Sequence, residues 1–288
     1  MSIVTFWNDS REQSGKTLTA VAVATNMSIE RNSRILLIST SCNDSTIKNC
    51  FWGKETSKVT NLFGNKNNNF AVENGIEGLH KLITSNKLEP SVITDYTKVV
   101  LKDRLEIIDS FRSANEKMNM ENIEQHKKIE DCYVELIKTA NKYYDMIIVD
   151  LDKMLSQQIK ESILKLSEVN VYVFSQRLSS ITGYKERKDT DEIFLQNNYI
   201  PVIGKYDKRS KYNLKNITRF LEEKKDINLV PLNLSFMEAT EESRVVDELL
   251  KFKNVKDKTD ENYIFIQEIL SLTNNIVKKV QELQMKMR

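Results

Sequence analysis

The sequence predicts an α/β protein in which a mostly parallel, twisted sheet of about seven strands carries helices on both faces. Short, nearly continuous apolar runs rich in β-branched residues recur along the chain, and such runs are typical of strands buried on both sides. Longer amphipathic segments separate the runs. This alternation indicates parallel strands joined by right-handed crossovers.

The strand predictions rest on seven apolar runs. These are Ser2–Trp7, Arg34–Ser39, Arg104–Ile108, Asp145–Asp150, Val169–Ser175, Tyr199–Gly204 and Ile227–Leu232. Between them, the alanine-rich segment Thr17–Ile29 predicts a helix that packs closely on the sheet. Apolar residues at spacings of three and four predict further helices over 129–140 and 155–166.

Two segments are less regular. Phe63–Gly75 is rich in Asn and predicts a loop, whereas Ser113–Lys128 is polar and charged and predicts a solvated helix or a mobile crossing. Neither interrupts the alternation enough to mark a domain boundary. Residues 1–288 are therefore interpreted as a single domain, with 262–288 as a C-terminal amphipathic helix.

The composition is that of an ordinary globular protein. Hydrophobic residues make up 40% of the chain and charged residues 29%, and the formal net charge of +2 gives no global attraction to nucleic acid or anionic lipid. We find no apolar window long enough to span a membrane and no signal-peptide pattern at the N-terminus. The three cysteines predict reduced thiols in a cytoplasmic protein, and two histidines argue against a histidine-based triad or metal site.

A phosphate-binding motif follows the first predicted strand. Gly15-Lys16-Thr17 matches the end of the G-x-x-x-x-G-K-[ST] loop, in which backbone N–H groups and Lys bind phosphates and the hydroxyl binds Mg²⁺. Ser10 occupies the position of the first glycine. A buried strand before the motif and a helix after it are the context that the chemistry needs.

An acidic strand end supports the interpretation of the phosphate-binding motif. The run Asp145–Asp150 ends in a carboxylate, as the acidic strand of such a site does, and Asp152 follows two residues later. An aspartate that caps a strand is a common alternative. The order of the two elements along the chain favours a nucleotide site.

The chain resembles the MinD/ParA family of deviant P-loop ATPases. The resemblance runs nearly end to end, from the first strand and phosphate loop through "YYDMIIVD" and "VNVYVFSQRLSSI" to "YIPVIGKYDKRS" and "NLVPLNLSFMEATEESRVVDELL". It implies binding of ATP and Mg²⁺. The nucleotide would contact nine residues: Ser10, Arg11, Ser14, Gly15, Lys16, Thr17, Leu18, Lys205 and Pro231. Thr17 and Asp150 would hold the metal, and Lys16 would also act in catalysis.

The loop departs from the family pattern K-G-G-x-G-K-[ST]. Arg11 aligns with the family's first lysine, which reaches the phosphates of the partner subunit in a nucleotide sandwich dimer. Glu12 and Gln13 replace the two glycines, so the loop loses conformational freedom. A carboxylate at Glu12 is unfavourable near phosphate unless it points away or pairs with Arg11.

Other departures concern hydrolysis and the base. Ser39 and Ser41 occupy the positions of the family's two aspartates after the second strand, and we expect Asp44 to be the substitute in catalysis. Gly204 occupies the position of an Asn that contacts adenine in the family, where Lys205 or Tyr206 would compensate. Loop divergence of this kind is similar to the TadZ/CpaE-like branch, which localises Flp/Tad pilus machinery.

The resemblance therefore implies a switch with weak or impaired ATP hydrolysis. Such a protein would form a homodimer on ATP and recruit or position a protein partner, in a pilus, secretion or DNA partition complex. The alternative is a catalytically inactive scaffold with the same fold. An enzyme of assimilation or cofactor biosynthesis on a related fold is a weaker interpretation, because no additional catalytic constellation is present.

Two surface features leave alternatives open. Residues 205–225 are rich in Lys and Arg with interleaved Tyr, which is typical either of a non-specific DNA surface or of a solvated loop and helix. The C-terminal stripe consists of Phe265, Ile269, Leu272, Ile276, Val280, Leu283 and Met287. It favours packing on the sheet over a partner helix, and least of all membrane binding. Cys42 and Cys50 are interpreted as incidental thiols.

Overall fold

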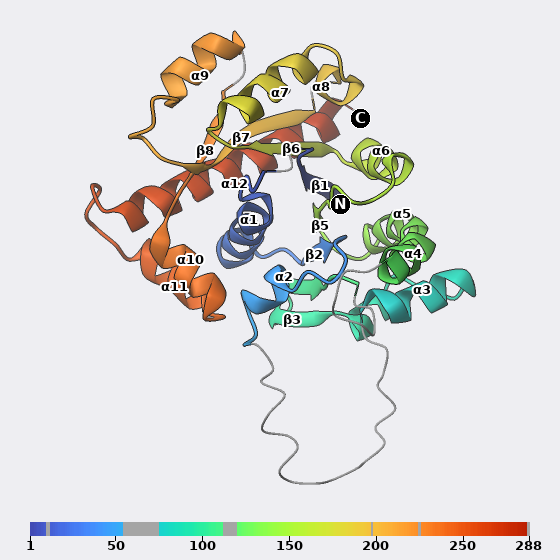
Figure 1. Ribbon diagram of the computed structural model, residues 1–288. Coiled ribbons are helices and arrows are strands. Elements are labelled where there is room, and N and C mark those ends of the chain that lie inside the picture. The colour runs from blue at the N-terminus through green and yellow to red at the C-terminus, as the bar shows by residue number, and fades with distance from the viewer. Residues whose placement is uncertain (10–11, 54–74, 112–119, 197, 224–225, 287–288) are drawn as a thin grey trace.

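The structure is a computed structural model, and it describes residues 1–9, 12–53, 75–111, 120–196, 198–223 and 226–286 (Figure 1). The predicted loop at 63–75 lies outside these residues except for Gly75. Of the polar segment 113–128, residues 120–128 are helical and belong to α4, Met120–Ile129.

Eight strands form one sheet in the order β3-β4-β2-β5-β1-β6-β7-β8. Their bounds are β1 Ser2–Trp7, β2 Ile35–Ser39, β3 Lys98–Leu101, β4 Leu105–Ile108, β5 Met146–Asp150, β6 Val169–Phe174, β7 Tyr199–Tyr206 and β8 Asn228–Pro231. Every pairing is parallel except that of β3 with β4. The predicted class and all seven predicted strands are confirmed.

The eighth strand, β3, is absent from the prediction. It pairs antiparallel with β4 at the edge of the sheet, and Asp103 turns the chain between them at φ 59°. Lys98 and Val99 are exposed. A four-residue edge strand with exposed side chains lacks the continuous apolar run by which buried parallel strands are recognised.

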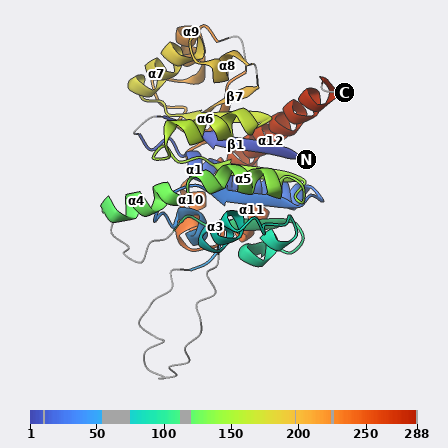
Figure 2. The ribbon, with the colours of Figure 1, turned by 90° about the vertical axis from the view of Figure 1, so that its right-hand side faces the viewer.

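Helices cover both faces of the sheet (Figures 1 and 2). One face carries α1 Lys16–Glu30, α2 Thr46–Asn49, α10 Leu234–Glu241, α11 Val245–Lys253 and α12 Glu261–Lys286. The other carries α3 Ile76–Thr84, the 3₁₀ turn η1 Val92–Tyr96, α4, α5 Asp131–Ala140, α6 Gln157–Leu166, α7 Leu178–Lys188, α8 Glu192–Leu195 and α9 Leu214–Leu221. The predicted helix at 129–140 corresponds to α5, except that Ile129 is the last residue of α4.

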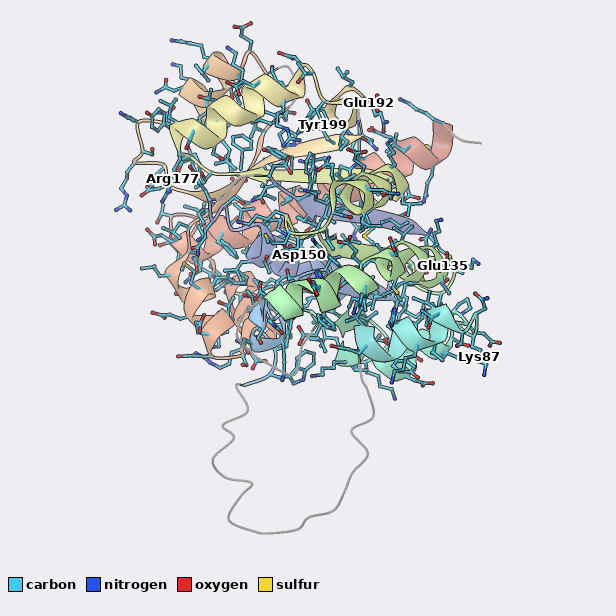
Figure 3. All side chains as sticks on the ribbon, turned by 45° about the vertical axis from the view of Figure 1, so that its right-hand side comes forward. Lys87, Glu135, Asp150, Arg177, Glu192 and Tyr199 are labelled. Carbon is cyan, nitrogen blue, oxygen red and sulfur yellow. The ribbon has the colours of Figure 1, made fainter. Side chains whose placement is uncertain are left out.

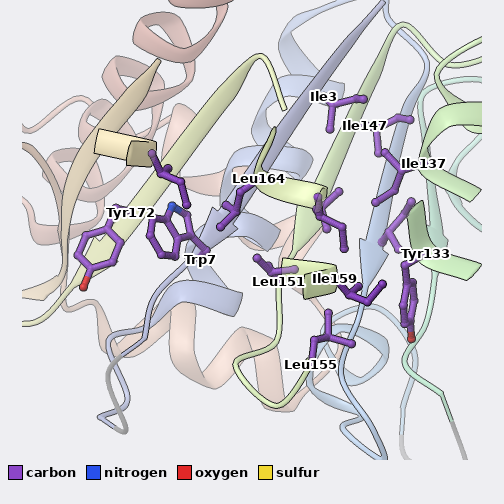
Figure 4. Close-up of a cluster of buried hydrophobic side chains, with 14 of the residues drawn as sticks. Ile3, Trp7, Tyr133, Ile137, Ile147, Leu151, Leu155, Ile159, Leu164 and Tyr172 are labelled. Carbon is purple, nitrogen blue, oxygen red and sulfur yellow. The ribbon is translucent and has the colours of Figure 1, made fainter. Parts of the chain in front are cut away.

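Alternate residues of the central strands pack into two cores. In β1, Ile3 and Trp7 belong to the core under α5 to α8, whereas Val4 and Phe6 belong to the core under α1 and α12. Figure 4 shows part of the first core, in which Ile3 and Ile147 from adjacent strands lie beside side chains of α5 and α6. Burial on both faces explains why these strands read as continuous apolar runs.

The C-terminal stripe packs on the sheet. Phe265, Ile269, Leu272, Ile276 and Val280 are at most 4% exposed, and they belong to the core that contains α1. Met287 lies outside the described residues. Within the described residues, no helix is both long and apolar enough to cross a membrane.

Candidate functional site

The predicted phosphate loop connects β1 to α1. Gly15 precedes the first residue of α1 and has φ 81°, a left-handed conformation that glycine adopts without strain. Ser14 is buried, and its hydroxyl accepts a hydrogen bond from Asn8 Nδ2 at 2.5 Å. The N-terminus of a 15-residue helix thus begins directly behind the loop, where its unpaired N–H groups and dipole favour an anion.

Lys16 and Thr17 both contact Asp150 at the end of β5. Lys16 Nζ lies 2.8 Å from Asp150 Oδ1, and Thr17 Oγ1 donates to Asp150 Oδ2 at 2.9 Å. Lys16 Nζ also donates to the carbonyl of Leu151 at 2.5 Å. The Asp150 side chain is only 1% exposed and lies in the middle of the molecule (Figure 3). A carboxylate this deeply buried requires such partners.

Thr40 joins the second strand to this group, which the sequence did not indicate. Its hydroxyl donates to the carbonyl of Asp150 at 3.2 Å and accepts from the backbone N–H of Asp152 at 2.8 Å. Because the carboxyl ends of β2, β5 and β1 meet here, residues from three strands surround the start of α1.

Glu12 points toward the start of α7. Its carboxylate accepts hydrogen bonds from Ser175 Oγ at 2.9 Å and from Ser179 Oγ at 2.5 Å. Arg177 Nε lies 3.9 Å from Glu12 Oε2. The hydrogen bond from Ser179 contributes most to holding the pKa of Glu12 below its ordinary value, against the opposing effect of burial. The carboxylate is therefore ionised near neutral pH.

A narrow pocket beside α1 is lined by four of the residues predicted to contact the nucleotide, Gly15, Leu18, Lys205 and Pro231. Its walls also include Phe236. Lys205 has φ 51°, and its Cγ would lie 3.1 Å from a Cβ added at Gly15. The structure thus brings Leu18, Lys205 and Pro231 together next to the phosphate loop, and Lys205 covers Gly15.

Gly204 has a structural role that the family resemblance did not indicate. A Cβ at this position would lie 2.1 Å from the carbonyl oxygen of Ser14 and 3.0 Å from Val173 Cγ1. The backbone of β7 therefore lies so close to the loop that a residue with a Cβ atom at position 204 would collide with it. A glycine inside an apolar strand is the sequence signal for such an approach, although the resemblance drew attention to a lost Asn instead.

A second, larger cavity of about 560 Å³ adjoins Glu12 and Gln13. It is lined by Glu12, Gln13, Ser175, Gln176, Arg177, Gly204 and Lys205. Lys205 therefore lines both this cavity and the narrow pocket beside α1.

Asp44 lies at the start of α2. Its Oδ1 accepts from the backbone N–H of Thr46 at 2.8 Å and from the Thr46 hydroxyl at 2.5 Å, the pattern of an Asx turn. Ser39 and Ser41 are buried. The catalytic role of Asp44 stays a prediction. Ser10 and Arg11 lie outside the described residues.

The basic segment 205–225 is partly neutralised by local contacts. Arg209 forms a two-pronged interaction with Asp207, and its side-chain hydrogen bonds lower the pKa of Asp207 to about 2. Lys208, Lys211, Lys215 and Arg219 are exposed. Residues 224–225 lie outside the described part of the chain.

Comparison with known proteins identifies the fold. No protein-family model and no curated protein matches the chain. Solved structures do match. A ParA family ATPase from Chlorobium tepidum is 16% identical over 94% of this chain and 98% of that chain, with a TM-score of 0.68.

Two further structures are similar. A Borrelia burgdorferi protein described as a plasmid partition protein, bound to AMPPNP, is 18% identical over 100% of this chain and 99% of its own, with a TM-score of 0.57. MinD in the MinC:MinD complex of Aquifex aeolicus is 15% identical over 96% of both chains, with a TM-score of 0.60. The chain has the fold of the MinD/ParA ATPases, and the narrower TadZ/CpaE-like assignment stays a prediction.

Proposed function

We propose that this chain is a single-domain, ATP-binding switch protein of the MinD/ParA type, whose nucleotide-dependent dimerisation recruits or positions a protein partner. The observation that carries the proposal is the meeting of Lys16, Thr17 and Asp150 at the N-terminus of α1. A lysine, a hydroxyl and a buried carboxylate behind a helix N-terminus are the groups that bind a nucleoside triphosphate with Mg²⁺.

The roles follow from the chemistry of each group. Lys16, whose side chain is 12% exposed, would exchange its contact with Asp150 for contacts with the β- and γ-phosphates. Thr17 and Asp150 offer the oxygen ligands that Mg²⁺ prefers, so these residues fit the metal. In this proposal Ser10, Arg11, Ser14 and Gly15 would contact the phosphates, while Leu18, Lys205 and Pro231 would border the base.

The resemblance supports a dimer and a protein partner. Arg11 is the proposed contact to phosphate, in cis or across the dimer, because a guanidinium binds phosphate oxygens in pairs. MinD of Aquifex aeolicus is similar to this chain and is found in complex with MinC. We propose that the partner here belongs to a partition, pilus or secretion assembly.

Hydrolysis in this proposal is slow. Ser39 and Ser41 cannot orient water as carboxylates do, and the Asp44 carboxylate is engaged by Thr46. Asp44 would have to leave its turn to act. The same observation favours the second candidate function, a scaffold that docks a partner without ATP turnover.

The test is equilibrium binding of a fluorescent ATP analogue with Mg²⁺, with molar mass measured by light scattering, on the wild type and on Lys16→Ala. We expect binding that doubles the mass and weakens at least about tenfold in Lys16→Ala, because a charge-assisted phosphate contact is lost. Lys102→Ala, an exposed lysine in the β3–β4 turn, is the matched control.

Phosphate release separates the two functions. Slow turnover that disappears in Lys16→Ala excludes the scaffold, whereas binding without turnover favours it. Absence of binding by the wild type at high micromolar nucleotide contradicts the switch.

Non-specific DNA is a further proposed ligand of the segment 205–225. The exposed Lys215 and Arg219 lie on α9, and phosphate contacts from such residues give affinity that falls with salt. A combined Lys215→Glu and Arg219→Glu variant should lose DNA binding and keep ATP-analogue affinity. Unchanged DNA binding would assign the segment to a solvated surface.

A further inference from the structure

The phosphate loop is attached to α7 through Glu12. In the glycine-rich pattern, the backbone of the loop finds its path through the freedom of glycine. Here Glu12 occupies one of those positions, and its carboxylate binds the hydroxyls of Ser175 and Ser179. The Glu12 side chain is 19% exposed. This part of the loop lacks the conformational freedom of glycine, and it is instead held in place by side-chain hydrogen bonds to an ionised carboxylate.

A second contact joins the loop to the other end of α7. Asp9, two residues after the end of β1, forms an ion pair with Arg187. Arg187 also pairs with Asp191 at 2.7 Å, and its guanidinium lies 5.6 Å from the centre of the Trp7 ring. Ser179 and Arg187 belong to the first and last turns of the same helix. The loop thus contacts α7 at both ends.

The β6–α7 connection and α7 are themselves hydrogen-bonded to the segment 207–220. Gln176 Nε2 donates to the carbonyls of Asp207 at 3.1 Å and Tyr212 at 2.8 Å, and its Oε1 accepts from the Asp207 N–H at 2.6 Å. Lys185 Nζ donates to the carbonyl of Phe220, in α9, at 2.7 Å. The β6–α7 connection, which contains Ser175 and Gln176, is therefore hydrogen-bonded to the segment before α9.

We propose that the phosphate loop and α7 move as one unit, with Glu12 as the positioning residue that joins them and the Asp9–Arg187 pair as the second attachment. The inference rests on the proposed nucleotide site, because phosphate binding is what displaces the loop. Packed elements change between discrete arrangements, so a displaced Glu12 carries the start of α7 with it. If nucleotide changes the affinity of α7 for a second ligand by some factor, linkage requires that this ligand change the affinity for nucleotide by the same factor.

The attachment itself is tested without nucleotide, by amide hydrogen exchange in wild type, Glu12→Ala, Ser179→Ala and the double variant. We expect each single variant to raise exchange in the first turn of α7 about tenfold, since each removes a hydrogen bond to an ionised group. The double variant should show no further increase over Glu12→Ala, because Glu12→Ala already removes the hydrogen bond from Ser179. Effects that multiply, or no effect, would overturn the attachment.

Two further variants, Gln13→Ala and Arg187→Met, serve as controls for this experiment. Gln13→Ala changes an exposed side chain of the same loop and should leave exchange in α7 unchanged. Ser179 is also exposed, so Ser179→Ala keeps the experiment decisive if Glu12→Ala does not fold. Arg187→Met should raise exchange in the last turn of α7 and not in the first.

The coupling is tested by adding the ATP analogue with Mg²⁺. We expect saturating analogue to change exchange in α7 at least threefold in the wild type, and to produce no change there in Glu12→Ala at saturation. A merely structural role for Glu12 would instead shift α7 exchange by the same factor with and without nucleotide. Binding by the wild type with no change in α7 overturns the coupling. Absence of binding refutes the proposed function, while the nucleotide-free comparison still decides the attachment.

Discussion

Three residues show how the predicted phosphate loop is accommodated although it has few glycines. Gly15 provides the left-handed turn before α1, and Gly204 provides the space in which the carbonyl of Ser14 lies. Glu12 takes a position where the family pattern has glycine, and its carboxylate turns toward Ser175 and Ser179. The charge that the sequence placed in the phosphate loop is therefore directed to α7.

Replacing Gly204 tests this arrangement. We expect Gly204→Ala to weaken ATP-analogue binding at least about tenfold and to lower the free energy of unfolding by about 1–3 kcal/mol, because its Cβ would collide with a backbone oxygen of the loop. Analogue titration and urea unfolding measure the two effects. Gly183→Ala is the control, since nothing lies within 4 Å of a Cβ there, and a helical alanine is neutral or stabilising. Equal behaviour of the two variants would show that the contact is not tight.

At the scale of elements, α12 packs against the sheet along most of its length. Six of its apolar residues are buried, namely Phe265, Ile266, Ile269, Leu272, Ile276 and Val280, whereas Met285 is 75% exposed. Arg31 at the end of α1 also donates to Asn274 Oδ1 at 3.0 Å. The helix thus completes the core on the face that carries α1.

A truncation of the stripe distinguishes core packing from an anchor. Ile269→Ala should lower the free energy of unfolding by about 2–5 kcal/mol, the usual cost of a cavity in a core, whereas Met285→Ala should change it by less than about 0.5 kcal/mol. Urea unfolding gives both values. A small effect of Ile269→Ala, combined with binding of the wild type to anionic vesicles, would contradict the packing role.

At the scale of the whole molecule, the sheet separates two cores, and the three cysteines are buried on both sides of it. Cys50 belongs to the core with α1, and Cys42 belongs to the core with α5. Burial is the main cause that raises the pKa of Cys50 to about 12 and that of Cys132 to about 11, and it also raises the pKa of Cys42.

Thiol labelling should therefore follow unfolding of the whole molecule. At pH 8 a thiol with a pKa of about 11 is ionised to about one part in a thousand, and the thiolate is the reactive form. We expect an aromatic disulfide reagent to label no thiol quickly in the native protein and three after unfolding in urea, with the midpoint of labelling at that of unfolding. A thiol that reacts in the native state as fast as free cysteine would contradict this.

Local pattern alone determined most of the architecture. The seven parallel strands, the helix after Gly15 and the stripe of α12 were predicted because burial on two faces and helical periodicity leave a signature within a few residues. The motif Gly15-Lys16-Thr17 and the carboxylate of Asp150 were found in the same way, and the structure brings them into contact.

Only the tertiary structure decided the remainder. The direction of Glu12 depends on serines of β6 and α7, and the need for glycine at 204 depends on the path of the loop at Ser14. The edge strand β3 and the division of α4 from α5 likewise escaped prediction. The edge strand β3 lacks the continuous apolar run by which buried strands are recognised. Glu12 and Gly204 depend on contacts between segments distant in sequence, and neither residue type nor local periodicity records where a distant backbone atom will lie.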